Sequence, residues 1–161
     1  MSTREKIVSW ETLKREVAVH RKQGKKISFT NGCFDILHFG HVSYLEAAQK
    51  PNRILIVGLN SDVSVKRLKG PGRPINPQKE RAHILAALEC VDYVAIFNED
   101  TPYNLIKVVK PDVLIKGADW KGKEVVGSDI VIKNGGKVEF AKYFTSYSTT
   151  KTIDQLSLKI R

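Results

Sequence analysis

Apolar runs and helix-like segments alternate along this chain. The continuous run RILIVGL at residues 53–59 predicts a strand buried on both faces, as in a parallel sheet. Four shorter runs predict further strands, at residues 26–31, 92–97, 112–116 and 137–141. Because a helix-like segment separates each strand from the next, the pattern predicts an α/β fold: a parallel sheet of about five strands with right-handed crossovers and helices on both faces.

Capping residues mark where the helices begin. Ser9 can cap a helix over residues 10–23. Asn76 and Pro77 supply a cap and a first helical position for a helix that runs to residue 89. Other helices are predicted over residues 40–50, 61–68, 102–109 and 128–133, and from Ser148 or Thr149 onwards. No linker, repeat or low-complexity segment interrupts this pattern, so residues 1–161 are expected to form a single domain.

Length and composition indicate an ordinary globular protein. A chain of 161 residues can fold around one core, and 42% of its residues are apolar and 27% charged. No apolar run approaches the roughly 20 residues of a membrane span. The first ten residues lack the apolar segment of a secretory signal. With only Cys33 and Cys90, no disulfide framework is indicated, so we expect a reduced, cytoplasmic protein.

The net charge of +10 points to a polyanionic partner without identifying it. Nucleic acid, an acidic membrane surface and a nucleotide all fit. Basic residues cluster between residues 66 and 81, where two glycines and two prolines at residues 70–74 break the segment into a loop. Such a run is commonly a solvated face. The alternative to a solvated face is a functional loop, which places these cations beside a phosphate-binding site.

The stretch NGCFDILHFGH, residues 31–41, carries the candidate chemistry. Neither a Walker A sequence nor GxGxxG follows the first strand, which argues against P-loop and ordinary dinucleotide-binding proteins. His38 and His41 lie three residues apart at the predicted start of a helix, so they share one face, and free amides there favour an anion. Gly40 lets a ligand approach the backbone. The combination predicts a phosphate-binding cradle with two titratable donors.

Other interpretations of the two histidines are a zinc pair or a structural pair. Zinc needs further ligands, and His20, His83 and the two cysteines do not have the spacing of a zinc site. A lone histidine is commonly structural, whereas two that flank a glycine directly after a strand favour a functional role. The cysteines are interpreted as small buried residues.

The stretch GCFDILHFGH resembles the HxGH signature of the cytidylyltransferase-like nucleotidyltransferases, whose fold is a Rossmann-like parallel sheet. The resemblance covers nearly the whole chain. Further blocks similar to this family are VGLNSD with RLKGPGRP, KERAHILAAL, the segment KGADWKGKEVVGSDIVIKNGGKV at residues 116–138, and YSTTKTI at residues 147–153. The resemblance therefore implies one nucleotidyltransferase domain over residues 1–161.

Two groups within that family are similar to this chain. The sequences HFGH and GADW resemble the glycerol-3-phosphate cytidylyltransferases. The combination of LKGPGRPINPQKER with VVGSDIVIKNGG is closer to the D-glycero-β-D-manno-heptose 1-phosphate adenylyltransferases, which in many bacteria form the C-terminal half of a bifunctional kinase and adenylyltransferase. Residues 142–146 depart from the Arg-Thr-Glu-Gly run of cytidylyltransferases, and the role of Lys142 stays open.

The resemblance implies a role for individual residues. It assigns catalysis to His38, His41 and Lys69. The residues implied in nucleotide binding come from the first strand and its loop, the GADW segment and the last block: Asn31, Gly32, Phe34, Asp35, Gly40, Asp119, Trp120, Ser148, Thr149 and Thr150. Those implied in contacts with the second substrate or with phosphate are Asn60, Asp62, Arg73 and Arg81.

Some of these residues have simpler alternatives. Asp35 would order its loop or contact substrate, and its simpler interpretation is a turn or cap residue; Trp120 is alternatively part of the core. Residues 148–150 form an ordinary helix cap on the simpler interpretation, which is compatible with phosphate binding. The loop from Lys69 to Arg73 is expected to be loosely held without ligand and to close over the substrates, as lids commonly do.

The resemblance implies transfer of AMP from ATP to D-glycero-β-D-manno-heptose 1-phosphate, which gives ADP-heptose for lipopolysaccharide core or related glycan synthesis. Mg²⁺ would be carried by the ATP phosphates, without protein ligands. A homodimer is expected, together with a separate heptose kinase and a phosphatase. No nucleic acid or membrane partner is expected. The alternatives are a CTP-dependent enzyme acting on glycerol 3-phosphate and, from another class, a basic nucleic-acid-binding module, although residues 66–81 contain no interleaved aromatic.

Overall fold

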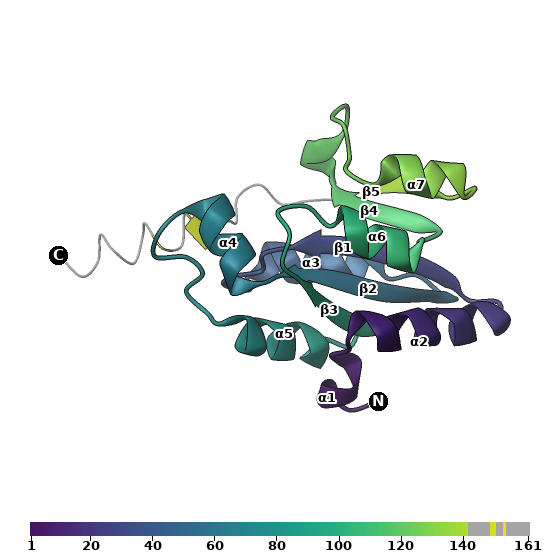
Figure 1. The fold of residues 1–161 in the computed structure, drawn as a ribbon, viewed down its shortest axis with the longest axis horizontal. Helices are drawn as coiled ribbons and strands as arrows, with labels where there is room; N and C mark the ends of the chain where they lie inside the picture. Colours follow the sequence, from purple (N-terminus) through teal and green to yellow (C-terminus); the bar gives the residue numbers. More distant parts are fainter. Residues whose placement is uncertain (142–148, 151–152, 154–161) are drawn as a thin grey trace.

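The computed structural model describes residues 1–141, 149–150 and 153. Five parallel strands form one sheet in the order β3-β2-β1-β4-β5 (Figure 1). The strands are β1 (Lys26–Gly32), β2 (Arg53–Asn60), β3 (Tyr93–Phe97), β4 (Val113–Gly117) and β5 (Lys137–Ala141). Each coincides within a residue or two with an apolar run of the sequence. The predicted Rossmann-like parallel sheet is confirmed.

Helices cover both faces of this sheet. In chain order they are α1 (Thr3–Lys6), α2 (Trp10–Lys22), α3 (Phe39–Ala48), α4 (Asp62–Lys69), α5 (Gln78–Ala87), α6 (Tyr103–Val109), the 3-10 helix η1 (Ala118–Trp120) and α7 (Ser128–Lys133). One core cluster joins α2, α6 and α7 to the sheet, and a second joins α3 and α5 to its other face. Along β2, Ile54 and Ile56 enter the first cluster, whereas Leu55 and Val57 enter the second. The alternation explains why this strand is apolar throughout.

The predicted cap is confirmed at α2 and differs at α5, and Ser61 caps α4 without having been predicted to do so. The side chains of Ser9 and Ser61 accept hydrogen bonds from backbone amides in the first turns of α2 and α4. Helix α5 begins at Gln78 with Pro77 as its N-cap, so the prediction that Asn76 caps it is wrong. The Asn76 side-chain amide instead donates to the Asp35 carbonyl at 2.9 Å. Helices α1 and η1 were not predicted, and the predicted C-terminal helix lies largely outside the described residues.

The strand order places a crevice at the carboxyl ends of β1 and β4. The chain moves from β1 outward to β2 and β3, then crosses back to β4 on the other side of β1. At such a reversal the two neighbouring connections leave on opposite faces of the sheet, which opens a ligand-binding crevice. Residues 31–41 follow β1 at this point. Among the described residues, no helix is long and apolar enough to cross a membrane.

Candidate active site

A cavity of about 560 Å³ opens at the crevice. Its walls come from the end of β1 with the loop and helix α3 that follow, the end of β2, the end of α4 with its loop, the loop after β3, the end of β4 with η1, and residues 126 and 149–150. The structure thus brings together segments from distant parts of the sequence. The residues predicted for the site that line it are Asn31, Gly32, Phe34, Asp35, His38, His41, Asn60, Lys69, Arg73, Asp119, Trp120, Thr149 and Thr150.

His38 and His41 form a stacked pair at the start of α3. His38 is the N-cap, and His41 lies in the first turn, so their imidazole rings come to 3.8 Å between centroids with an interplanar angle of 19°. Phe34 packs edge-on against His41, with ring centroids 5.1 Å apart. This arrangement puts both rings at the cavity, beside a helix N-terminus, whose dipole favours an anion.

Burial sets the protonation of the pair. Burial, together with the neighbouring His38, lowers the pKa of His41 to about 4, while a hydrogen bond with the Ile36 backbone acts in the opposite direction. Burial also lowers the pKa of His38. Two stacked imidazolium rings would repel each other. At neutral pH His41 is therefore a neutral imidazole with a single N–H, and a bound anion would favour its charged form, in which both ring nitrogens are donors.

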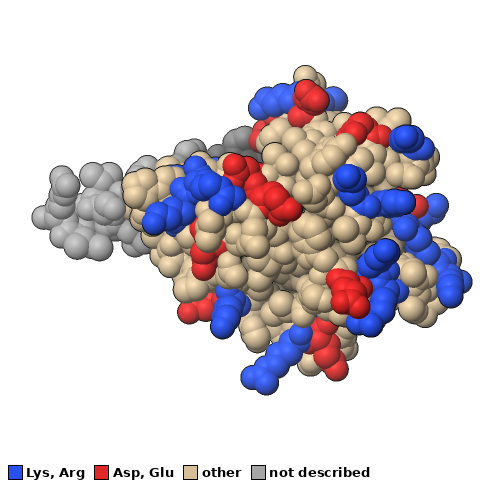
Figure 2. Space-filling view, viewed as in Figure 1, with Lys and Arg blue, Asp and Glu red and all other residues tan. Residues whose placement is uncertain are grey.

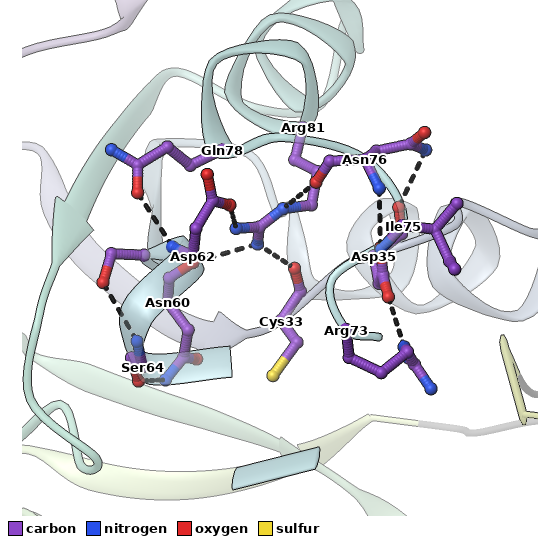
Figure 3. A network of polar contacts seen from close by, with 11 residues as sticks. Cys33, Asp35, Asn60, Asp62, Ser64, Arg73, Ile75, Asn76, Gln78 and Arg81 are labelled. Carbon is purple, nitrogen blue, oxygen red and sulfur yellow. Dashed lines mark hydrogen bonds and ion pairs between the residues drawn. The ribbon is translucent and has the colours of Figure 1, made fainter. Parts of the chain in front are cut away.

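Asp35 holds the loop that follows α4 against the loop that follows β1 (Figure 3). Its carboxylate accepts hydrogen bonds from Arg73 Nε at 2.5 Å, the Ile75 amide at 2.7 Å and the Asn76 amide at 3.0 Å. The Asp35 side chain is only 1% exposed. Because both of its oxygens are occupied, Asp35 orders the loop and orients Arg73, which was one of the two interpretations from the sequence.

The loop between α4 and α5 is therefore anchored at one end. Arg73 lines the cavity and forms an ion pair with Asp35. Gly70 and Gly72, which lie between Lys69 and Arg73, have positive φ angles of 90° and 82°. Lys69, at the start of the predicted lid, is the last residue of α4. Closure of the loop over a ligand stays a prediction.

Asp35→Asn tests this anchor. The variant can still accept from the backbone amides, but it loses the charge that holds Arg73, so we expect faster proteolytic cleavage within residues 66–74 and about tenfold weaker ATP binding. Limited proteolysis with and without ATP and magnesium measures the first effect, and calorimetry the second. Asp129→Asn, which changes an exposed carboxylate that accepts a hydrogen bond from the Tyr103 hydroxyl and does not line the cavity, is the matched control. Equal cleavage of wild type and Asp35→Asn would contradict the anchor.

Arg81 is a buried structural residue, and its predicted phosphate contact is corrected. Its guanidinium, 0% exposed, donates to the carbonyl oxygens of Cys33, Asn60 and Asn76 at 2.5, 2.9 and 2.9 Å. It also donates to the Asp62 carboxylate at 2.8 Å. These hydrogen bonds tie the ends of β1 and β2 to α5 (Figure 3). Neither Arg81 nor Asp62 lines the cavity, because each satisfies the other within the protein.

Gly40 and the last block of predicted residues differ in outcome. Gly40 is buried in the first turn of α3, between His38 and His41, which line the cavity, and its predicted role in nucleotide binding stays a prediction. Thr149 lines the cavity and its hydroxyl donates to the Ile36 carbonyl at 3.2 Å, which ties this segment to the loop before His38. Ser148 lies outside the described residues.

The pattern of the sequence did not single out Lys116. This residue ends the apolar run of β4, lines the cavity, and donates from Nζ to Asn31 Oδ1 at 2.6 Å. Its Nζ lies 5.3 Å from the centroid of the Trp120 ring, which is 38% exposed on the cavity wall and is therefore not a core residue. The sequence feature that could have identified Lys116 was a single lysine at the carboxyl end of a buried strand. Asp100 and Thr101 also line the cavity without having been predicted.

The fold and the paired histidines define an α/β protein built to bind a phosphorylated ligand at the carboxyl end of its sheet. The chain belongs to the cytidylyltransferase-like family, which matches residues 29–153. This family membership confirms the nucleotidyltransferase class that the HxGH motif predicted.

Relatives and solved structures agree with this assignment. The bifunctional protein HldE of a Nitratiruptor species is 61% identical over 135 residues, which are 84% of this chain and 28% of that protein. HldE of Syntrophotalea carbinolica is 51% identical over 146 residues, 91% of this chain and 30% of that protein. The chain thus spans less than a third of the length of these curated relatives.

Two crystal structures share the fold. The lipopolysaccharide core biosynthesis protein from Thermoplasma volcanium GSS1 superposes with a TM-score of 0.60 at 28% identity, over 76% of this chain and 98% of that chain. Pantoate-beta-alanine ligase from Francisella tularensis superposes with a TM-score of 0.54 at 17% identity, over 84% of this chain and 66% of that chain. The second likeness concerns the fold alone.

Proposed function

We propose that this protein transfers AMP from ATP to D-glycero-β-D-manno-heptose 1-phosphate. An oxygen of the sugar 1-phosphate attacks the α-phosphorus of ATP, the bond from that phosphorus to the bridging oxygen breaks, and pyrophosphate leaves as ADP-heptose forms. The observation that carries the proposal is the stacked pair His38 and His41 at a helix N-terminus, inside a cavity that Lys69 and Arg73 also line. The similarity to HldE and to a lipopolysaccharide core biosynthesis protein supports the choice of sugar.

The chemistry requires positioning and stabilisation of charge more than a protein nucleophile. The attacking oxygen already belongs to a phosphate, so no side chain has to be activated. Negative charge builds on the phosphoryl oxygens and on the leaving pyrophosphate, and donors aimed at that charge lower the barrier. His38 and His41 supply such donors from the start of α3, and Lys69 and Arg73 supply cations from the end of α4 and the loop after it.

Mg²⁺ is proposed to arrive with ATP, where it neutralises phosphate charge. Of the three carboxylates that line the cavity, Asp35 is engaged by Arg73 and Asp100 by Arg67, whereas Asp119 is exposed. An octahedral ion that keeps phosphate oxygens and water as most of its ligands fits such a site. The residues of this chain would then bind the phosphates that carry the ion.

The remaining expectations belong to the same proposal. The product would serve lipopolysaccharide core or related glycan synthesis, in the cytoplasm. A heptose kinase and a phosphatase would act on the sugar before this step, and the protein would work as a homodimer. Sedimentation of the purified protein tests the dimer independently of the chemistry.

A pyrophosphate-release screen tests the proposed reaction. Each of the four nucleoside triphosphates is combined with heptose 1-phosphate in both anomeric forms, glycerol 3-phosphate and choline phosphate. We expect release with ATP and the β-anomer of heptose 1-phosphate, and ADP-heptose as the second product. Release with CTP and glycerol 3-phosphate alone would replace the proposal by the cytidylyltransferase alternative.

A nucleic-acid-binding function has less support from the surface. On the face shown in Figure 2, lysines and arginines are interspersed with aspartates and glutamates. Several cations of the protein are paired with carboxylates, as in Arg53–Glu139 and Arg67–Asp100. A nucleic-acid site would gather unpaired cations along one stripe. Oligonucleotide binding that weakens steeply with salt, without pyrophosphate release in the screen, would favour this second class.

A further inference from the structure

Lys116 is a buried cation in the wall of the cavity. The residue is 8% exposed, and its ammonium donates to the neutral side-chain oxygen of Asn31 at 2.6 Å. Among the residues that the structure describes, no carboxylate forms an ion pair with it. Lysine is almost never buried without a partner of opposite charge.

The groups around Lys116 do not supply that partner. Asn31 on β1 is neutral, and the Tyr44 hydroxyl on α3 is occupied by Thr30 and by the Ile115 carbonyl, at 2.6 and 3.0 Å. Asp119 on η1 attracts the ammonium from a distance but is itself exposed. The histidine pair across the cavity is neutral at pH 7 or above, because its pKa values are lowered.

The protein therefore leaves this charge partly uncompensated. Burial lowers the pKa of Lys116 to about 8, with Asp119 acting in the opposite direction. An ammonium offers three donors, and the Asn31 oxygen takes one of them. An anion placed at the remaining donors would restore the charged form, because opposite charges at close range favour ionisation.

We propose that Lys116 is a further nucleotide-binding residue, which takes a phosphate oxygen of the bound nucleotide as its counterion and gains a proton from solvent when the nucleotide binds. Asn31 positions the ammonium, and the neighbouring Trp120 ring lies on the same part of the cavity wall. This inference rests on the proposed function, since it takes ATP as the ligand.

Calorimetry of ATP binding at pH 8 tests the proton uptake. Titrations in Tris and in EPPS, which differ in ionisation enthalpy, give the number of protons taken up per nucleotide. A group with a pKa near 8 is half protonated at pH 8, so full protonation on binding takes up about half a proton. ATP and AMP should both show this uptake. Adenosine, which has no phosphate, should show none.

Three variants assign the proton to Lys116. Lys116→Met should lose the uptake and bind ATP about tenfold or more weakly. Lys116→Arg keeps a charge that does not titrate, so it should bind ATP better than Lys116→Met and still show no uptake. Lys123→Met is the matched control, because Lys123 is exposed, lies 5.8 Å from the same Trp120 ring and does not line the cavity. It should behave as wild type.

The outcomes separate this inference from the proposed function. ATP binding without proton uptake in the wild type, or equal uptake in Lys116→Met, would overturn the role of Lys116 while leaving the reaction possible. If Lys116→Met does not fold, persistent uptake in Lys116→Arg overturns the role in the same way. Uptake that depends on Lys116, in a protein that releases no pyrophosphate with any acceptor in the screen, would uphold the binding residue and reject the proposed reaction.

Discussion

Replacing His41 with alanine is expected to lower kcat by about 100- to 1,000-fold, because it removes a donor aimed at charge that develops only in the transition state. KM for ATP should rise only a few-fold, since Lys69, Arg73 and the helix N-terminus still meet the triphosphate in the ground state. Steady-state kinetics of pyrophosphate release measure both constants. A fall in kcat without a matching rise in KM is the signature of a transition-state contact.

A second histidine provides the control for this experiment. His83 lies on α5, is exposed and does not line the cavity, so His83→Ala should retain wild-type kinetics. His41→Asn keeps a neutral side-chain donor and should recover part of the lost rate. Near-normal turnover in a folded His41→Ala protein would show that the ring packs against Phe34 and His38 without taking part in the reaction.

The neutral state of the pair has a consequence for the order of events. Since burial and the neighbouring ring keep His41 uncharged, the free site does not hold two adjacent imidazolium charges. The positive charge of the site then comes from the cations of the loop and from the protonation that a bound ligand induces. A triphosphate that enters the cavity raises the pKa of each group that it contacts, so the cradle becomes more cationic as it is filled.

Features set by a local pattern could be predicted from the sequence. The apolar run of β2 is buried on both faces, and Ser9 before α2 is a cap. The histidine motif directly after the first strand could be placed at the carboxyl end of the sheet, because parallel strands share that edge. The four-residue helix α1 has too short a pattern to be recognised.

Features set by burial could not be predicted in the same way. Arg81 stands in the charged segment QKERAH, which is typical of a solvated helix, yet its side chain is fully buried. Lys116 lies near the end of a strand whose preceding residues are apolar, and only the neighbouring end of β1 brings Asn31 to it. The roles of Arg81 and Lys116 both depend on carbonyl or amide groups from distant parts of the chain. The spacing of residues in the sequence does not reveal these contacts.

The network around Arg81 is expected to dominate the stability of the site. One guanidinium satisfies the carbonyl oxygens of Cys33 after β1, Asn60 at the end of β2 and Asn76 before α5. These groups have no equivalent partner in water once the site is folded, and leaving a buried acceptor unsatisfied costs about 1–3 kcal/mol. The same side chain also neutralises part of the charge of Asp62. Its contribution therefore exceeds that of an isolated surface ion pair.

Arg81→Met should accordingly lower the free energy of unfolding by about 3 kcal/mol or more, because it leaves one buried and two part-buried carbonyls without their donor while keeping much of the side-chain volume. Urea unfolding at pH 7 measures the loss. Arg67→Met is the matched control: it removes an arginine 45% exposed and paired with an exposed aspartate, so its cost should stay within about 1 kcal/mol. Arg81→Lys, which retains a charge and fewer donors, should fall between them and gives a measurable value if Arg81→Met is unfolded in water. Equal costs for the Arg81 and Arg67 variants would contradict the network's role, because a buried donor to three carbonyls would then stabilise the fold no more than a surface pair does.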